Sequence, residues 1–359
     1  MHNSQKLICA IRDVFVAALI MSACSVSASV FSCRTNGAGF AVTVLSGDFS
    51  APELRSFSAE NAGSLLVGFS EAISAVDLHI TTSDNNLYAD GTRINAVEDP
   101  KLVALSLSKK TVRGEKYLLT GAVSDAAGNS LSFSLAFSGY NDEVPRLALS
   151  EVRSEYSKPK CEFIELYAVT GGNLAGVTLY SAYDGIDCLY EFPACAVAAG
   201  EYLVVHYRKI EDGALDETGD NLKLSTCTDS SDARDFWVDN REARIGKSDV
   251  ILLRERDGGA LLDALWYAES GKTTIKNVAT TAAVAKAAEE AFNAGLWPGG
   301  VQPENAVCSD GATYTRTISR QNIARLAQGG EGEQNGKAVW QLTASSGASP
   351  GKPNSSAIK

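Results

Sequence analysis

Three glutamates in the middle of the chain come closest to a pattern that could perform acid–base chemistry. Glu162 and Glu165 lie three residues apart, so a regular strand would turn them to opposite faces. Glu151 could instead meet Glu165 from an adjacent strand. Glycoside hydrolysis needs two carboxyl groups that face each other across the bond, and nothing in the sequence indicates a cleft there. We therefore predict no catalytic residues.

Other catalytic and metal-binding patterns are missing from the sequence. It has only 3 histidines, and the nucleophile elbow, phosphate loop, H-E-x-x-H and kinase motifs do not occur. His206 would have to act as the base for a catalytic cysteine, and no local signature supports that role. His79 lies in an alternating segment where a solvent-facing position is expected. We predict that the protein is not an enzyme and uses no cofactor and no metal site.

Composition and length indicate what kind of fold positions these residues. The chain has 359 residues, a net charge of −11 and 45% hydrophobic residues, which is an ordinary globular balance and long enough for two domains. The acidic balance argues against nucleic acid as a partner, because phosphate binding needs clustered Lys and Arg.

The first predicted domain spans residues 38–140 and alternates with a period of two, which predicts short strands of a β-sandwich. Residues 53–58 with 65–71 (LLVGFSE), and then 117–129 (YLLTGAVSDAAGN), are similar to the opening and closing motifs of bacterial Ig-like domains of the SbsA type. The resemblance covers about 90 residues and implies a spacer or interaction module of a surface protein.

Asp125 and Asn129 flank the turn in the second of these motifs. Turn chemistry is the favoured interpretation, because Asp and Asn bind backbone groups locally and Gly128 supplies a positive φ. A calcium ligand role is the alternative, since Asp, Asn and carbonyl oxygens suit that ion. Residues 141–145 then form a polar linker that ends at Pro145.

The second predicted domain spans residues 146–354 and again shows antiparallel β patterning with turns between strands. The motifs LSEV, EFIELY, LAGVTLY, GEYLVV and DVILL…DGG…LLDALWY occur in this order, followed by Arg320, Trp340 and SPGKPN. Together they resemble the lamin-tail domain in its bacterial form. That resemblance implies an Ig-like β-sandwich on exported proteins, without catalytic residues. Residues 355–359 are a tail.

Two insertions depart from the lamin-tail pattern. Residues 208–247 are rich in Asp and Glu, which favours a solvated acidic loop, with a cation-binding loop as the alternative; residues 236–238 (FWV) are expected to pack it onto the domain. Residues 268–314 contain a predicted helix from Thr280 to Ala294 with Gly295 as its C-cap. Its expected buried face is formed by Val284, Ala287, Ala288, Ala291 and Phe292.

The N-terminus predicts export. Basic residues precede an apolar run from Val14 to Met21, which is too short to span a membrane. The following Met21-Ser22-Ala23-Cys24 resembles a bacterial lipobox, so we expect a signal peptide over residues 1–23, lipid attachment at Cys24 and a tether over residues 24–37. Lipidation at Cys33, or cleavage near Ala28 to give a soluble secreted protein, are the alternatives.

Eight cysteines occur, and six remain after the signal peptide and a lipidated Cys24 are removed. An oxidising compartment makes disulfides plausible. Cys188 and Cys195 lie close together around a short apolar run and are the candidate pair, although six cysteines allow 15 connectivities.

These features predict an all-β protein with two Ig-like β-sandwich domains in tandem, the second carrying a helix-containing insertion. We expect a lipid-anchored protein of the bacterial cell envelope that displays a non-catalytic binding, adhesion or structural module. Its partners would be the membrane, through the anchor, and an unknown protein or glycan. The alternatives are an accessory to an extracellular hydrolase and a carbohydrate-binding module, which would need exposed Trp or Tyr rings.

Overall fold

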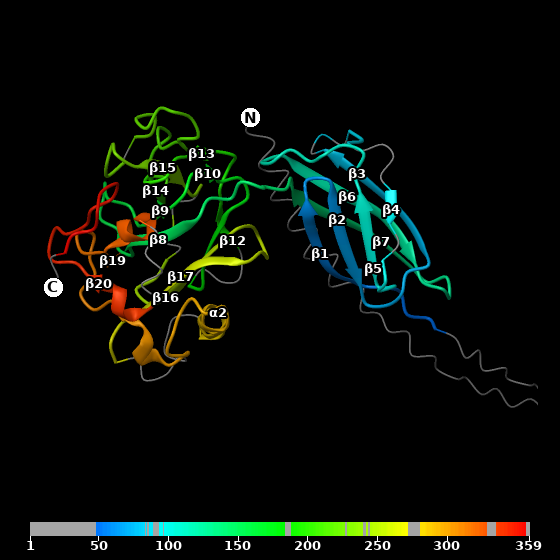
Figure 1. Ribbon diagram of the computed structural model, residues 1–359. Helices are drawn as coiled ribbons and strands as arrows, with labels where there is room; N and C mark the ends of the chain where they lie inside the picture. Colours follow the sequence, from blue (N-terminus) through cyan, green and yellow to red (C-terminus); the bar gives the residue numbers. More distant parts are fainter. Residues whose placement is uncertain are drawn as a thin grey trace, which may run out of the picture. The chain divides into compact units, whose positions relative to one another are not determined.

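The structure is a computed structural model that describes residues 48–356, apart from positions 83, 85, 89–92, 96, 184–187, 227, 240–241, 243–244, 272–280 and 329–334. The predicted signal peptide and tether, with the candidate lipid-attachment residues Cys24 and Cys33, lie outside the described residues. The described chain is all-β, with two Ig-like β-sandwiches in tandem (Figure 1). Among the described residues, no helix has the length and apolar character needed to cross a membrane.

The first sandwich packs a four-stranded sheet against a three-stranded sheet. The strand orders are β1-β2-β5-β4 and β3-β6-β7, and all neighbours are antiparallel. The strands are β1 (Leu54–Asn61), β2 (Ser64–Phe69), β3 (Ala75–Thr82), β4 (Arg93–Asn95), β5 (Leu102–Ser106), β6 (Lys116–Ser124) and β7 (Ser130–Ser138).

The core of this sandwich follows from the period-two pattern of the strands. Val67 and Leu105 from one sheet and Ile80 and Leu119 from the other are completely buried in one apolar cluster. Alternate residues of a strand point to opposite faces, so each strand contributes every second side chain to the core. His79 is exposed on β3, as predicted.

The second sandwich packs a six-stranded sheet, in the order β15-β14-β9-β8-β19-β20, against a five-stranded sheet, in the order β12-β11-β16-β17-β18. The strands of the first sheet are β8 (Leu147–Arg153), β9 (Phe163–Ala168), β14 (Tyr202–His206), β15 (Arg234–Trp237), β19 (Ile318–Arg320) and β20 (Trp340–Leu342). Those of the second sheet are β11 (Thr178–Ser181), β12 (Cys188–Glu191), β16 (Asp249–Arg254), β17 (Leu261–Ala268) and β18 (Val307–Cys308). The two-residue strands β10 (Gly172–Asn173) and β13 (Ala196–Val197) pair separately.

The six-stranded sheet is covered on both faces. Its inner face contributes Leu149 and Leu166 to the main core, together with Leu179 and Leu265 from the other sheet. Its outer face carries a second, smaller cluster that contains Phe163 and residues of the 3-10 helix η3 (Ile323–Gln328). Because both faces are covered, every residue of β8, β9 and β14 is buried. Two further 3-10 helices are η2 (Pro303–Asn305) and η4 (Lys337–Val339).

The insertion over residues 208–247 adds a strand that its acidic composition does not indicate. Its β15 pairs in parallel with β14, and Phe236 and Val238 are buried in the main core. A parallel neighbour needs a crossover connection of a dozen or more residues, and residues 207–233 provide it. The expectation that residues 236–238 pack the insertion onto the domain is confirmed.

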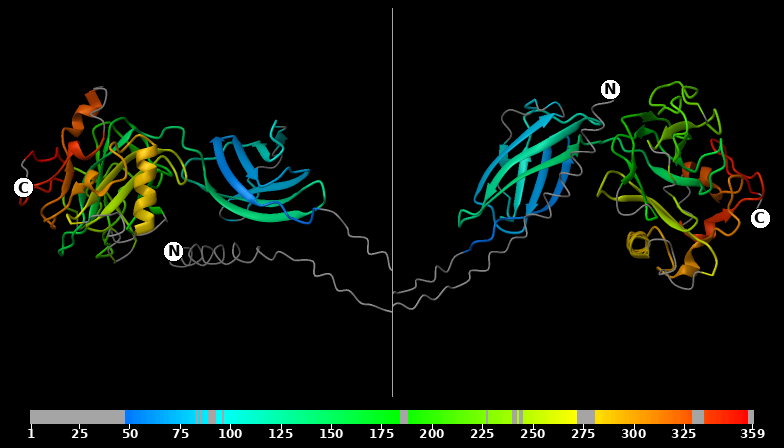
Figure 2. Two further views of the ribbon diagram at one scale, coloured as in Figure 1. Left: turned by 90° about the horizontal axis from the view of Figure 1, so that it is seen from below. Right: turned by 180° about the vertical axis from the view of Figure 1, so that it is seen from behind.

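The predicted helix is present as α2 (Thr281–Asn293), and Figure 2 shows it as a single ribbon on the second sandwich. Val284, Ala287, Ala288 and Ala291 are buried against β16 and β17, as expected. Gly295 follows with φ +72°, the left-handed conformation of a C-cap. Phe292, in contrast to its expected place on the buried face, is 46% exposed because it lies beyond the stripe that meets the sheet.

The disulfide predicted between Cys188 and Cys195 is not formed. Cys195 is a free thiol, 2% exposed, within the main apolar core. Its Sγ lies 3.9 Å from the carbonyl oxygen of Glu217, and burial raises the pKa of the thiol. Proximity along the chain is misleading here, because the side chain of Cys195 is directed into the sandwich.

Candidate functional site

The register of the six-stranded sheet brings Glu151 and Glu165 together. They are directly opposite each other on β8 and β9, and the register shifts at Ser150 through a bulge. All three residues are completely buried. The suggestion that Glu151 could meet Glu165 from an adjacent strand is therefore confirmed.

A turn of chain far along the sequence closes over this pair. We call residues 349–354 the SPGKPN segment. The backbone N–H of Ser349 donates to both carboxylate oxygens of Glu151, at 3.1 and 3.2 Å, and that of Gly351 donates to Oε2 of Glu165 at 2.6 Å. Nδ2 of Asn354 donates to the backbone oxygens of Ser150, at 3.0 Å, and of Arg320, at 2.8 Å. The two carboxyl groups thus hold the segment by its backbone.

Two hydroxyl groups complete the hydrogen bonding of the pair. Ser150 Oγ donates to Oε1 of Glu165 at 2.7 Å, and Thr317 Oγ1 donates to Oε1 of Glu151. Burial raises the pKa of Glu151 to about 7, despite the opposing hydrogen bonds from Thr317 and Ser349. Burial, and then the neighbouring charge of Glu151, raise the pKa of Glu165 well above its usual value.

Gly351 makes the close approach of the segment possible. Its φ is +77°, and a Cβ there would lie 2.7 Å from Ser230 Oγ and 3.0 Å from the backbone nitrogen of Ala233. Both neighbours belong to the 208–247 insertion. The SPGKPN segment therefore lies between the sheet and the insertion.

A row of side chains continues across the same outer face of the sheet. Arg153 stacks on the ring of Phe163, with its Cζ 4.6 Å from the ring centroid, and its Nη1 donates to Asp229 of the insertion at 2.5 Å. His206 lies next to Phe163 and stacks on Trp237 with a centroid distance of 4.2 Å. Because Arg153, Phe163 and His206 are neighbours in the strand register, they share one face.

His206 is completely buried and bonded to Asp235. Its Nε2 lies 2.5 Å from Oδ1 of that carboxyl group, and its Nδ1 meets no hydrogen-bond partner among the described residues. Burial raises the pKa of Asp235, against the lowering effect of His206. This imidazole–carboxylate contact joins β15, which belongs to the insertion, to β14, away from solvent.

Glu217 organises the insertion from inside. It is completely buried, and it accepts hydrogen bonds from the backbone nitrogens of Leu224, Ser225 and Asp235 at 2.9–3.0 Å. The prediction of a solvated acidic loop is therefore wrong for Glu217 and Asp235. Other acidic residues of the insertion, such as Asp220 and Asp232, are exposed.

Glu162 has a different binding partner from Glu165. Its carboxylate binds the guanidinium of Arg208 through contacts of 2.8–3.0 Å. It therefore does not form an acid–base pair with Glu165. In the described part of the chain, each of these carboxyl groups is engaged by the protein itself.

A buried ion pair joins the two sheets, and sequence reasoning missed its acidic member. Arg320 Nη1 donates to Oδ2 of Asp263 at 2.7 Å, and Asn335 Nδ2 donates to the other oxygen at 2.6 Å. Trp340 Nε1 donates in turn to Asn335 Oδ1 at 2.9 Å. Arg320 and Trp340 belong to the motifs found in the sequence; the alternation of β17, with one carboxylate among apolar residues, is the signal that could have indicated Asp263.

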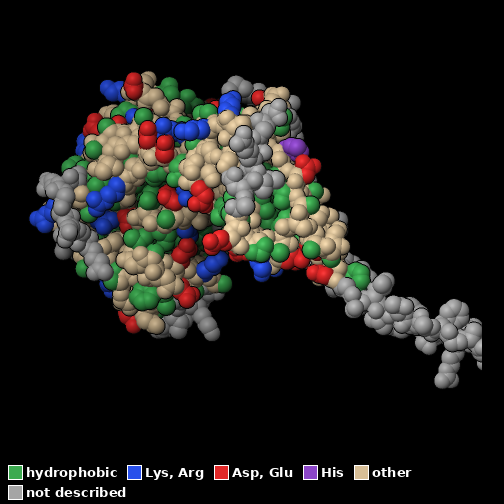
Figure 3. All heavy atoms as spheres, turned by 45° about the vertical axis from the view of Figure 1, so that its right-hand side comes forward, with side chains coloured by type: hydrophobic (Ala, Val, Ile, Leu, Met, Phe, Trp, Pro, Cys, Tyr) green, Lys and Arg blue, Asp and Glu red, His purple; other side chains and the backbone are tan. Residues whose placement is uncertain are grey.

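A tryptophan surface for sugar stacking is absent from the described residues. Trp237, Trp266, Trp297 and Trp340 are all between 1% and 5% exposed. On the face drawn in Figure 3, Lys and Arg are interspersed with Asp and Glu and do not gather in one basic patch.

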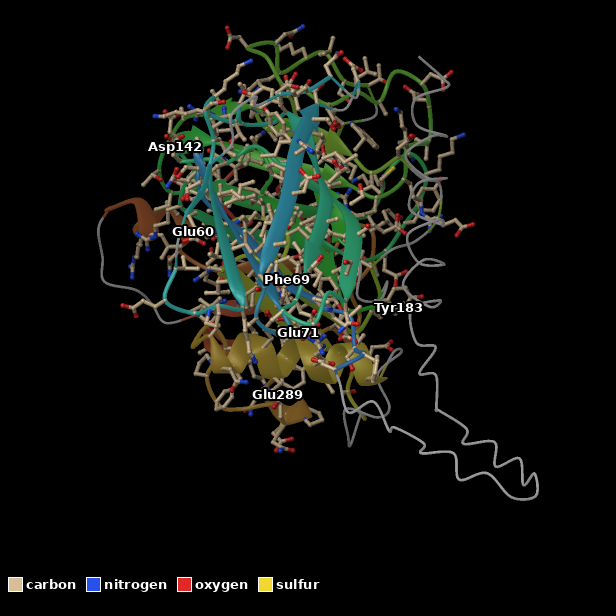
Figure 4. All side chains as sticks on the ribbon, turned by 90° about the vertical axis from the view of Figure 1, so that its right-hand side faces the viewer. Glu60, Phe69, Glu71, Asp142, Tyr183 and Glu289 are labelled. Atoms are coloured by element: carbon tan, nitrogen blue, oxygen red, sulfur yellow. The ribbon has the colours of Figure 1, made fainter. Side chains whose placement is uncertain are left out.

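An acidic triad lies at one end of the first sandwich. Carboxylate oxygens of Asp48, Glu71 and Asp125 lie within 4.8 Å of one another; Figure 4 shows Glu71 just beyond Phe69, where β2 ends. Asp125 accepts hydrogen bonds from the backbone nitrogen and Nδ2 of Asn129, at 2.9 and 2.8 Å, which confirms the turn chemistry. Burial, and then the neighbouring carboxylates, raise the pKa of Glu71.

The described surface of the second sandwich has a cleft beside α2. It has a volume of about 500 Å³ and is bordered by β11, the β16–β17 turn and the helix. Tyr180, Arg254, Lys286 and Glu289 line it, and Glu289 lies on α2 in Figure 4. Arg254 is paired with Glu290 of the helix at 2.6 Å. The cleft therefore presents both signs of charge beside an aromatic ring.

The second domain is an Ig-like β-sandwich in which the SPGKPN segment covers the buried carboxyl groups of Glu151 and Glu165 on the outer face of the six-stranded sheet. The chain belongs to the family described as "TP_1001_2nd: protein second domain", whose model matches residues 145–342. A relative from Treponema pallidum (strain Nichols), named "Uncharacterized protein", is 34% identical over 165 residues. The match covers 46% of this chain, and the chain spans 42% of the length of that relative.

Solved structures give more distant matches. The N-terminal part of the bacterial S-layer protein SbsC aligns with a TM-score of 0.25 and 17% identity, over 37% of this chain and 35% of that one. A longer SbsC structure, rSbsC(31-844), aligns with a TM-score of 0.24 and 13% identity, over 43% and 32%. A DUF4785 family protein from Legionella pneumophila subsp. pneumophila str. Philadelphia 1 aligns with a TM-score of 0.19 and 14% identity, over 44% and 47%.

Proposed function

We propose that the protein is a lipid-anchored module of the bacterial cell envelope that acts by binding or adhesion, without catalysis. The observation that carries this proposal is the closure of the Glu151–Glu165 pair. Two carboxyl groups with raised pKa values would suit acid–base catalysis if a substrate reached them. Here both are completely buried, and the backbone of Ser349 and Gly351 occupies their oxygens.

The lipid anchor is proposed from the sequence. Met21-Ser22-Ala23-Cys24 supplies the lipobox-like site, and two acyl chains suffice for stable residence in a membrane. The assignments of the two domains to the SbsA-type and lamin-tail families stay predictions. Both would place the protein among exported surface modules.

We infer that the partner contacts the second sandwich at the cleft beside α2. The cleft combines Tyr180, Arg254 and Lys286 with acidic side chains of the helix, which suits a polar partner rich in hydrogen-bonding groups, such as an envelope glycan. A carbohydrate partner would then be bound by side-chain hydrogen bonds and by the ring of Tyr180. Stacking on exposed tryptophan rings would not be needed.

Anchoring is tested by palmitate labelling in a bacterial host. Wild type, Cys24→Ser and Cys33→Ser are compared for incorporated label and for partition between membrane and soluble fractions. We expect label and membrane residence to be lost only in Cys24→Ser, with Cys33→Ser as the matched control. Loss of label only in Cys33→Ser would move the anchor, and no label in wild type would overturn the proposal.

Binding is tested with the purified protein without its anchor. Arg254→Ala and Lys286→Ala are compared with Lys352→Ala, which removes an exposed lysine of the same domain, for binding to isolated cell-wall glycan. We expect the first two variants to weaken binding and the third to match wild type. Equal binding by all three, or no binding by wild type, would exclude the cleft as a glycan site. Release of product from the glycan would contradict the non-catalytic assignment.

A further inference from the structure

The SPGKPN segment is fastened by two groups that can change charge. Glu151 holds Ser349, and Glu165 holds Gly351, each through a backbone N–H. The two carboxyl groups are direct neighbours in the β8–β9 register and both are completely buried. Two neighbouring buried carboxylates cannot both ionise without strong repulsion, so the closed segment favours a state that retains a proton.

The charged groups around the pair do not neutralise it. Arg153 is the cation that acts on Glu151, but it is bonded to Asp229, whose charge has the opposite effect on Glu151. Glu165 is affected mainly by its burial and by Glu151. Tyr202 of β14 also faces the pair, and its own pKa is raised by burial and by both glutamates. No element packed against Glu165 supplies a compensating cation among the described residues.

The segment carries one further charged contact. Nζ of Lys352 lies 3.7 Å from Asp232 of the insertion, and both side chains are largely exposed. An exposed pair of this kind contributes roughly 0–1 kcal/mol, so the buried carboxyl groups dominate the attachment. Gly351 packs against Ser230 and Ala233 of the same insertion. Movement of the segment would therefore also uncover that side of the insertion.

We propose that Glu151 and Glu165 form a pH-dependent latch for the SPGKPN segment, which stays closed while the pair retains a proton and opens when both groups ionise. Opening lets water reach the carboxylates, so their affinity for protons falls and a proton is released. A rise in pH therefore favours the open state. The latch controls access to the outer sheet face beneath residues 349–354 and goes beyond the display role proposed above.

The sign follows from the direction of the pKa shifts. Both groups have a higher pKa in the closed state than a solvated glutamate, whose pKa is near 4.5. Closure is therefore most favoured at acidic pH, and it is lost as the pH rises from the solvated value towards the raised values. For one coupled proton, the ratio of closed to open states falls about tenfold per pH unit between about pH 5 and about pH 7.

Amide hydrogen exchange, corrected for the intrinsic pH dependence of exchange, tests the latch. Protection of the amides of Ser349 and Gly351 is followed in the wild-type protein from about pH 5 to about pH 9, with Leu166 of β9 as the reporter of global opening. We expect protection in the segment to lie below that of Leu166 at every pH and to fall about tenfold per pH unit in the lower part of this range, in Asp249→Asn as well as in wild type. A change of less than about threefold in either protein, or protection of the segment equal to that of Leu166 throughout, would overturn the proposal.

Two variants sharpen the result. Glu165→Gln mimics the protonated carboxyl group, because the amide oxygen still accepts from Gly351 and the amide nitrogen donates to Ser150. We expect its segment to stay protected at alkaline pH. Asp249→Asn is the matched control: Asp249 is also completely buried with a pKa raised to about 7, but it binds Ser181 and Tyr183 and not the segment. A pH profile of protection in Glu165→Gln that matches wild type, or loss of the pH response in Asp249→Asn, would refute the latch. Far-UV circular dichroism checks that both variants fold. If a variant does not fold, the pH profile of protection in the wild-type protein still tests the latch.

Discussion

Asp263 of β17 and Arg320 of β19 form an ion pair between the two sheets of the second sandwich, with Nη1 of the arginine 2.7 Å from Oδ2 of the carboxylate. Both side chains are almost completely buried. The second carboxylate oxygen is held by Asn335, and the backbone nitrogen of Leu149 donates to Oδ2 as well. This network connects three strands and the loop before β20 at one point.

Removal of Arg320 should therefore be costly. Arg320→Met leaves Asp263 buried without its cation, and we expect a loss of about 3–5 kcal/mol in the free energy of unfolding. Lys352→Met breaks an exposed pair and is the matched control, with an expected effect of roughly 0–1 kcal/mol. Urea unfolding measures both. If Arg320→Met were as mild as the control, the ion pair would not fasten the sheets.

Asp249 should make stability depend on pH. It is completely buried, and its burial raises its pKa to about 7, although Ser181 and three backbone nitrogens donate to it. Because the folded pKa is raised, stability from this group is complete below an ordinary aspartate pKa and is lost as the pH rises through about 7. The expected slope approaches about 1.4 kcal/mol per pH unit, which is tenfold in the equilibrium constant.

Comparison of wild type with Asp249→Asn isolates this contribution. Unfolding free energies are measured by urea titration at about pH 5, 6, 7 and 8, and the difference between the two proteins should narrow or reverse as the pH rises. A constant difference over this range would show that Asp249 is already ionised in the folded state at acidic pH.

Gly351 should resist substitution more than another glycine of the same domain. Gly351→Ala combines a φ of +77° with close contacts to Ser230 and Ala233. Gly258 has a φ of +65°, and no described atom lies within 4 Å of the position that a Cβ would take, so Gly258→Ala carries only the conformational strain. We expect Gly258→Ala to cost about 1 kcal/mol and Gly351→Ala to cost about 2–3 kcal/mol. Equal melting temperatures for the two variants would contradict the close packing of the segment.

Cysteine accessibility checks the absence of the Cys188–Cys195 bond. Cys308 is exposed, whereas Cys161 and Cys195 are buried. Alkylation of the native protein should modify Cys308 rapidly, and Cys195 only after unfolding without reductant. Peptide mapping by mass spectrometry distinguishes the two. Recovery of a peptide that links Cys188 to Cys195 would restore the disulfide prediction.

The strand pattern is predictable from the sequence because it depends on local alternation. The same alternation allows Glu151 and Glu165 to be placed on adjacent strands, and helical periodicity places the helix between Thr280 and Ala294. The SPGKPN segment is recognisable as a motif, but its contact with Glu165 cannot be inferred, since Gly351 and Glu165 lie 186 residues apart. Such contacts depend on which distant segments pack together in the tertiary structure, and the local spacing of residues in the sequence does not predict this.

The incorrect predictions, for the disulfide and for the acidic insertion, also come from using local sequence features where tertiary packing decides the outcome. Closeness along the chain favours a bond between Cys188 and Cys195, although the direction of each side chain decides whether a bond can form. The acidic composition of the 208–247 insertion favours a solvated loop, and composition does not reveal that Glu217 accepts three backbone hydrogen bonds from inside the fold. No catalytic role is assigned to His206 from the sequence, and in the structure its side chain contacts Asp235, a partner that the sequence does not indicate.

The order of strands in the six-stranded sheet also determines when the second sandwich can form. β8 lies between β9 and β19, so one of its neighbours begins at Phe163 and the other only at Ile318. The first sandwich, in contrast, is built entirely from residues 54–138. During synthesis from the N-terminus, the first sandwich can therefore fold early. The second sandwich can fold only after β19, which begins at Ile318, has been synthesised. Contacts between distant residues slow folding, so the second sandwich should set the rate at which the protein reaches its native state.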